Sequence, residues 1–194
     1  MGLWHVNVGG RAIHICNMEP VSYTHLKVIR TILRGEEVRH LIILGIDPGI
    51  ATVGFGVVRA QQAQVDLVRC GTITTPAGQR LSLRLKQIYL DMQALLETFQ
   101  PDAIAIEELF FNTNLTTGIS VAHGRGVLVL AGEMSGIPMY EYTPLQVKQA
   151  IAGYGRASKK QMMEMVRRQL HLEAVPRPDD AADALALAIC HARY

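Results

Sequence analysis

The chain is poor in the features that mark secreted and membrane-bound proteins. Its three cysteines, Cys16, Cys70 and Cys190, are odd in number and far apart in 194 residues, so they indicate neither a disulfide framework nor a zinc site. No apolar run reaches the roughly 18 residues that a membrane span needs. Nothing near the N-terminus resembles a signal peptide. We therefore expect a protein of the reducing cytoplasm with no membrane partner.

An excess of one charge is also missing. The net charge is +2, with 19% charged and 49% apolar residues, which is typical of one globular domain. Five of the 19 Lys and Arg and three of the 17 Asp and Glu lie in residues 1–40, so 14 of each sign remain beyond them. Any affinity for nucleic acid must therefore come from local basic patches and metal rather than from overall charge.

Residues 1–40 lack sustained apolar periodicity and are predicted to be a leader, with the folded domain at 41–194. Residues 21–26 can be back-translated into a transposase adapter used in sequencing libraries. Residues 34–38 can be back-translated into a purine-rich ribosome-binding site shortly before Leu41, which would be a TTG start codon. The hypothesis is a non-native leader, and a natural disordered extension is the alternative.

From residue 41 onward the apolar pattern predicts an α/β domain. A three-stranded antiparallel meander followed by alternating strands and helices favours a five-stranded mixed sheet flanked by helices. Pro144 suits the first turn of a helix, and Ser158 suits an N-cap. The predicted strands are 41–46, 54–59, 64–74, 103–107 and 137–142, and the predicted helices are 81–99, 117–135, 144–152, 159–170 and 180–191.

Two carboxylates end predicted strands. Asp47 precedes Pro48-Gly49, so it would project from a rigid platform where the backbone turns. Glu107 ends another apolar run, and because side chains alternate along a strand, only one of Glu107 and Glu108 can face Asp47. We favour Glu107. An aspartate that caps its own turn and a solvent-exposed glutamate are the alternatives.

Two more carboxylates, Asp180 and Asp183, are three residues apart and therefore adjacent on one helix face. Helix capping and the macrodipole explain Asp179 and account partly for Asp180, but they fit Asp183 less well, because its neighbours are apolar. Four acids without a Cys or His cluster predict two Mg²⁺ ions, with Mn²⁺ as a substitute, and phosphodiester hydrolysis. Asp47 is the best candidate to bridge the two ions.

Basic and aromatic residues near these acids are candidates for contacts with DNA. Each basic residue could instead be an ordinary solvated surface charge, and an aromatic that follows Glu107 could pack in the core or stack on a base. The candidates are Lys148, Lys159, Lys160, Arg125, Arg156 and Phe110.

These motifs, in this order, resemble the RuvC-type Holliday junction resolvases over nearly all of residues 41–194. The resemblance is carried by Ile43-Leu44-Gly45-Ile46-Asp47-Pro48-Gly49, Ala105-Ile106-Glu107, Gln146-Val147-Lys148 and Asp180-Ala181-Ala182-Asp183-Ala184-Leu185-Ala186. It implies a ribonuclease H-like fold and a homodimer that cuts two opposed strands of a four-way DNA junction during recombination and repair. It also implies a RuvA/RuvB-type branch-migration complex as partner.

The resemblance also implies roles for individual residues. Asp47, Glu107, Asp180 and Asp183 become the metal-binding catalytic acids, Lys148 and Lys159 support catalysis, and Phe110 lies near the junction. Small residues on one predicted helix would permit close approach of a second subunit or, equally, tight packing onto the chain's own sheet. These residues are Gly118, Ala122, Gly124, Gly126, Ala131 and Gly132.

Three other functions compete with junction cleavage. The first is a ribonuclease H-like nuclease that acts on RNA–DNA hybrids or RNA precursors, with the same acids and a different substrate shape. The second is a nucleotide-binding protein of the sugar-kinase or actin type, which also begins with Gly-Ile-Asp-x-Gly. The third is a catalytically silent DNA-binding subunit.

Overall fold

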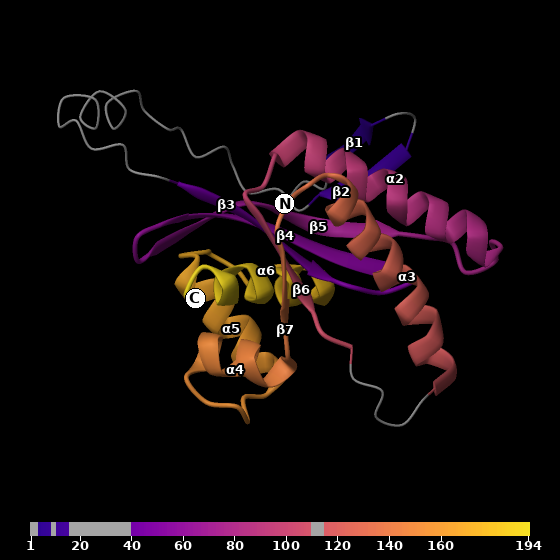
Figure 1. Cartoon of the computed structure of the whole chain (residues 1–194). Helices are drawn as coiled ribbons and strands as arrows, with labels where there is room; N and C mark the ends of the chain where they lie inside the picture. The colour runs from indigo at the N-terminus through magenta and orange to yellow at the C-terminus, as the bar shows by residue number, and fades with distance from the viewer. Residues whose placement is uncertain (1–3, 9–10, 16–39, 110–114) are drawn as a thin grey trace, which may run out of the picture.

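The computed structural model describes residues 4–8, 11–15, 40–109 and 115–194. Seven strands form one sheet in the order β1-β2-β5-β4-β3-β6-β7 (Figure 1). The strands are β1 Trp4–Val8, β2 Arg11–Ile15, β3 Leu41–Asp47, β4 Thr52–Gln61, β5 Gln64–Thr74, β6 Ala103–Glu107 and β7 Met139–Tyr142.

The five strands from β3 to β7 are those that the sequence predicts. β3, β4 and β5 form the antiparallel meander, and β6 and β7 run parallel to β3, so the predicted mixed sheet is confirmed. The hairpin β1–β2 was not predicted. It extends the sheet beyond β5 through His14↔Thr72 and Ile15↔Gly71. The outer edge of β5 offers unpaired backbone groups, which an extended segment can satisfy. The foreign origin of residues 1–40 stays a prediction.

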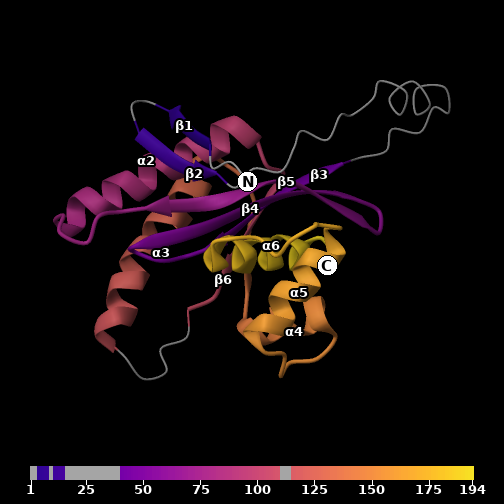
Figure 2. The same cartoon turned by 180° about the vertical axis from the view of Figure 1, so that it is seen from behind.

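In the part of the chain that the structure describes, five helices cover the two faces of the sheet, and their ends differ from the predicted ones by at most two residues. α2 and α3 lie on one face, and α4, α5 and α6 lie on the other (Figures 1 and 2). Within the described residues, none of the helices combines the length and the apolar character needed to cross a membrane. The bounds are α2 Leu81–Phe99, α3 Leu115–Met134, α4 Pro144–Ala152, α5 Lys159–Gln169 and α6 Asp179–His191.

The alternation of side chains along β3 and β6 divides the core into two clusters. Leu44, Ile46 and Ile106 pack under α2 and α3, whereas Ile43 and Ala105 pack under α4, α5 and α6. Residues 47 and 107 have the parity of this second group. The side chains of both strand-end acids are therefore directed to the face that α6 covers.

Glycines let α6 lie directly on the sheet. A Cβ on Gly45 would come within 2.0 Å of the Ala184 carbonyl oxygen, and one on Gly54 within 2.0 Å of the Asp180 carbonyl oxygen. A Cβ on Gly56 would lie 2.7 Å from the Leu185 amide nitrogen. These are backbone atoms that cannot give way, so the close approach depends on glycine. It brings the first turn of α6 beside the end of β3.

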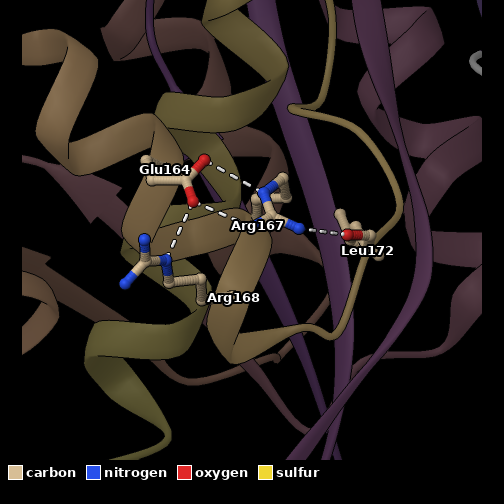
Figure 3. A network of polar contacts seen from close by, with 4 residues as sticks. All are labelled: Glu164, Arg167, Arg168 and Leu172. Atoms are coloured by element: carbon tan, nitrogen blue, oxygen red, sulfur yellow. Dashed lines mark hydrogen bonds and ion pairs between the residues drawn. The ribbon is translucent and has the colours of Figure 1, made fainter.

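Ion pairs and a hydrogen bond stabilise the C-terminal end of α5, away from the strand-end acids. Arg167 and Arg168 each hold Glu164 at 2.8 Å, and Arg167 also donates to the Leu172 carbonyl oxygen at 2.9 Å (Figure 3). The contacts of Arg167 close the turn that follows the helix. The Arg168 side chain is 65% exposed, so its ion pair with Glu164 is screened by solvent and contributes little to stability.

Candidate active site

Asp47 and Glu107 meet because parallel neighbouring strands end at the same edge of the sheet. β3 pairs with β6 as far as Ile46↔Ile106, and each acid is the next residue of its strand. Both carboxylates line one cleft beneath α6. Glu107, rather than Glu108, is therefore the acid on the Asp47 side, as strand alternation predicts.

The α6 acids approach the same edge from the helix. Asp183 lines the cleft with the two strand-end acids. Asp180 lies one turn earlier, with its carbonyl oxygen against Gly54, the residue that pairs with Asp47. The charge of Asp180 contributes to the raised pKa of Asp47. All four predicted acids are thus gathered at one site.

The cleft has a volume of about 230 Å³. Five of the predicted site residues line it, namely Asp47, Glu107, Asp183, Lys148 and Lys159, with Pro144, Val147, Met162, Ala186 and Leu187 as its apolar wall. A larger depression of about 540 Å³ lies elsewhere, between the β4–β5 turn and the C-terminus. It contains no carboxylate, and its Arg193 donates to the Ala150 carbonyl oxygen, so its chemistry is poorer.

Burial and mutual repulsion disfavour charge on these acids. Burial raises the pKa of Asp47 to about 7, aided by the charges of Glu107, Asp183 and Asp180. Burial, and then the charge of Asp183, raise the pKa of Glu107, which Lys148 partly offsets. The pKa of Asp183 is raised by burial against the opposing hydrogen bond from Lys159. The site is therefore a partly buried cleft with an excess of negative charge.

Two capped helices carry the lysines. Thr143 and Gln146 form a capping box at the start of α4, and Pro144 occupies its first turn, as predicted. Ser158 and Gln161 form a second capping box at the start of α5, which confirms the predicted N-cap. The two capped helices next to the cleft therefore fix the backbone positions from which the Lys148 and Lys159 side chains extend.

Lys159 bridges two acids of α6. Its Nζ lies 3.1 Å from Asp183 Oδ2 and 3.7 Å from Asp179 Oδ2, and its side chain is 57% exposed. Asp179 also accepts a 2.7 Å hydrogen bond from Arg177. Asp179 lies in the first turn of α6, where the predicted macrodipole interaction operates, but its predicted role as a cap is wrong, because Pro178 is the N-cap and no side-chain cap bond forms. The Asp179 carboxylate pairs with Lys159 and Arg177 instead.

The donor set fits a hard divalent cation. The acids offer oxygen ligands only, which suits Mg²⁺ or Mn²⁺. A cation would also relieve the desolvation and repulsion that raise the pKa of Asp47. Within the described residues, no three acidic, histidine or cysteine side chains converge on a single point as they stand. Lys159 holds part of the Asp183 carboxylate in this arrangement.

Arg125, a predicted DNA contact, is engaged by partners within the chain. Its Nε donates to the Glu107 carbonyl oxygen at 3.1 Å, its guanidinium pairs with Glu141, and its side chain is only 17% exposed. These internal contacts leave little of the guanidinium for a phosphate. Arg156 and Lys160, in contrast, are exposed in and after the loop between α4 and α5. Phe110 lies outside the described residues.

The sequence did not reveal what holds the loop after Asp47. The Thr75 amide donates to the Ala51 carbonyl oxygen at 2.9 Å, and Thr75 Oγ1 donates to the Ile50 carbonyl oxygen at 2.5 Å. Arg84 Nε donates to Thr75 Oγ1 at 2.8 Å. A threonine at a strand end gives no signal of such a role, because its partners are backbone carbonyls from another part of the chain.

The mixed sheet, with acids at the ends of its adjacent strands β3 and β6 and on a helix across one face, defines a ribonuclease H-like resolvase fold. The family model described as crossover junction endodeoxyribonuclease RuvC matches residues 43–191. The chain belongs to this family.

Relatives agree with this assignment. The crossover junction endodeoxyribonuclease RuvC of Brevibacillus brevis is 57% identical over 152 residues, which cover 78% of this chain and 92% of the relative. That of Syntrophomonas wolfei is 56% identical over 149 residues, covering 77% and 87%. The structure of Thermus thermophilus RuvC in complex with a Holliday junction substrate has a TM-score of 0.73 and 35% identity, covering 79% of this chain and 94% of that one.

Proposed function

We propose that the chain is a Mg²⁺-dependent endodeoxyribonuclease that resolves Holliday junctions by paired symmetric nicks, in DNA recombination and repair. The observation that carries the proposal is the gathering of Asp47, Glu107 and Asp183 with Lys148 and Lys159 in one cleft of a RuvC-family chain. The Thermus thermophilus relative in complex with a junction substrate supports the choice of DNA.

Asp47, Glu107, Asp180 and Asp183 would hold two Mg²⁺ ions, for which Mn²⁺ could substitute. When bound, such a pair supplies an activated water and neutralises the leaving oxygen. The protein's own part is to hold the carboxylates close together and partly buried, so that a cation relieves their mutual repulsion. The raised pKa values of Asp47, Glu107 and Asp183 support this part of the proposal.

Lys148 and Lys159 would orient the scissile phosphate. Both lysines line the cleft, where the field of a cation is screened less than on an open surface. Lys159 is more than half exposed, so its ammonium group can reach a phosphate while Asp183 remains near. The exposed Arg156 and Lys160 would bind the backbone further along the DNA, and Phe110 would stack on a base near the junction.

We also propose a homodimer, because symmetric incision of a two-fold junction needs two sites related by symmetry. Gly124, Ala131 and Gly132 pack against residues of their own subunit, so this part of the small-residue surface is internal. Gly126 faces open space, and large apolar side chains are exposed on the same helix, namely Ile119, Leu130 and Met134. This exposed side of α3 is the surface that a second copy would cover.

A RuvA/RuvB-type complex is the proposed partner that supplies junctions, and the cytoplasm is the proposed location. Cys70 and Cys190 are both buried, in line with reduced cysteines that act as small apolar core residues.

The function is tested by incubating the chain in Mg²⁺ with a synthetic four-way junction, a linear duplex of the same sequence and an RNA–DNA hybrid. We expect paired nicks at symmetric positions in opposed strands of the junction, and little cutting of the duplex or the hybrid. Preferential cutting of the hybrid would favour the ribonuclease alternative. Hydrolysis of ATP without nicking would favour a nucleotide-binding protein, and binding without nicking would favour a silent subunit.

A further inference from the structure

We propose that Arg125 is a positioning residue that sets the end of β6, and with it Glu107, while Glu141 orients Arg125. The proposal rests on the proposed function, since it takes Glu107 as one of the working acids. Arg125 touches neither the cleft nor another of the acids, so its effect would pass through the backbone of Glu107.

At its C-terminal end, β6 is paired with β7 but no longer with β3. The pairing of β6 with β3 stops at Ile106, whereas its pairing with β7 continues to Glu107↔Tyr142. The next amide, that of Glu108, donates to the Tyr142 carbonyl oxygen at 2.9 Å. After Glu108 the chain leaves the sheet. Arg125 Nε supplies a further contact here, 3.1 Å from the Glu107 carbonyl oxygen.

Arg125 connects three elements. It stands on α3, donates to a carbonyl of β6 and pairs with the carboxylate of Glu141 on β7. A guanidinium can serve two partners in different directions with its fixed fork of donors, which a single ammonium group cannot do in the same geometry. The Glu141 side chain is 52% exposed, so its charge interaction is screened and contributes mainly to the orientation of Arg125.

Arg125 and the Glu107 carboxylate lie on opposite faces of the sheet. Glu141 alternates with Tyr142, which packs under the helices α4, α5 and α6, so the Arg125–Glu141 pair lies on the α3 side. The Glu107 carboxylate is directed to the α6 side, where the substrate would lie. Arg125 is therefore well placed to fix the acid and poorly placed to touch DNA.

The decisive variant is Arg125→Gln, measured in three ways. Single-turnover cleavage of a four-way junction should slow by about 10–100-fold, as for residues that orient metal ligands. Mn²⁺ binding to the protein without DNA, followed by electron paramagnetic resonance, should weaken by about 10-fold. Junction affinity without divalent metal, and its dependence on salt, should stay unchanged. If Arg125 bound a phosphate instead, affinity would fall and the salt slope would decrease by about one.

Arg168→Gln is the matched control, since it also removes an arginine from an ion pair with a glutamate but lies at the far end of α5. It should leave all three measurements unchanged. Arg125→Lys should recover only part of the cleavage rate, because it keeps the charge but not the fork. Full recovery by lysine, or unchanged Mn²⁺ binding in Arg125→Gln, would overturn the proposal.

The variant Glu107→Gln distinguishes a failure of the positioning role of Arg125 from a failure of the proposed function. If Glu107→Gln cuts junctions normally, the assignment of the acid is wrong. If Glu107→Gln is inactive and Arg125→Gln cuts normally, only the positioning role is wrong. Should Arg125→Gln fail to fold, as judged by circular dichroism, Glu141→Gln carries the test. It should slow cleavage and weaken Mn²⁺ binding by a smaller factor, again with unchanged junction affinity; no change in either would overturn the proposal.

Discussion

The two faces of the sheet differ in how closely their helices approach it. Under α2 and α3 the space is filled by large buried side chains, such as Phe55, Ile88 and Leu128. On the other face, α6 lies against the glycines of β3 and β4, with backbone touching backbone. The first face makes a rigid platform, and the second brings helix acids next to strand acids. The site thus lies on the face where packing is closest.

Replacing Asp47, at the end of β3 on the face that α6 covers, should have the largest effect on cleavage. Asp47→Asn keeps the shape and removes a charged oxygen ligand, so we expect the cleavage rate to fall by about 10³-fold or more. Junction binding, measured by fluorescence anisotropy without Mg²⁺, should persist, because the basic residues remain. Loss of binding together with cutting would mean that Asp47 holds the structure rather than the metal. Asp66→Asn, on β5 outside the cleft, is a control that should cut at the wild-type rate.

Much of this site follows from local sequence rules. Strand alternation and the common end of parallel strands bring Asp47 and Glu107 together, and the apolar surroundings of Asp183 make a charge there costly without a partner. Both arguments need only residues within a few positions of each acid. The fold is predictable for the same reason, since periodicity marks the five strands and five helices from residue 41 onward.

Contacts between residues that are far apart in the sequence could not be predicted. From the sequence alone, Arg125 is one more basic residue and Asp179 is a candidate helix cap. Their roles follow only from the contact of Arg125 with a carbonyl of β6 and of Asp179 with Lys159. The hairpin β1–β2 depends on the free edge of β5, which no periodicity within residues 1–40 reveals. In each case the partner is far away in the sequence.

The close approach of α6 can be tested by adding a single carbon. Gly54→Ala would place a Cβ about 2.0 Å from the Asp180 carbonyl oxygen, so α6 must shift. We expect a loss of about 1–3 kcal/mol in the free energy of unfolding, measured in urea, and slower cleavage. The matched control is Gly78→Ala, in the loop between β5 and α2 and outside the proposed dimer surface, where a Cβ meets nothing within 4 Å. It should change the free energy of unfolding by less than about 0.5 kcal/mol. Equal effects at both positions would refute the argument that α6 packs directly on the backbone of β4.

The crowding of acids predicts a stability cost that depends on pH. Because the folded pKa of Asp47 is raised from 3.8 to about 7, its contribution to stability is present below about pH 4 and is lost as the pH rises through 7. In EDTA at pH 8, Asp47→Asn should therefore melt at a higher temperature than the wild type, and its free energy of unfolding should be higher by about 2–4 kcal/mol. At pH 4 the gain should vanish. Glu97→Gln, exposed on α2, is the control.

At pH 8, adding Mg²⁺ should make the wild type more stable than Asp47→Asn. A cation that binds only the folded wild type raises its melting temperature by mass action, whereas the variant gains less. A variant that is destabilised at pH 8 in EDTA would contradict the crowding argument, because it would mean that the Asp47 carboxylate is stabilised by its surroundings.

The smallest expected effect concerns which face the DNA covers. Lys160 is exposed in the first turn of α5, on the α6 side, and Lys86 is exposed on α2, on the opposite side. Lys160→Gln should weaken junction binding a few-fold and reduce the salt slope by about one, because one phosphate contact is lost. Lys86→Gln changes the net charge equally, so any general electrostatic attraction falls by the same amount in both variants. An equal loss of affinity would show that overall charge, rather than the face that carries the acids, determines binding.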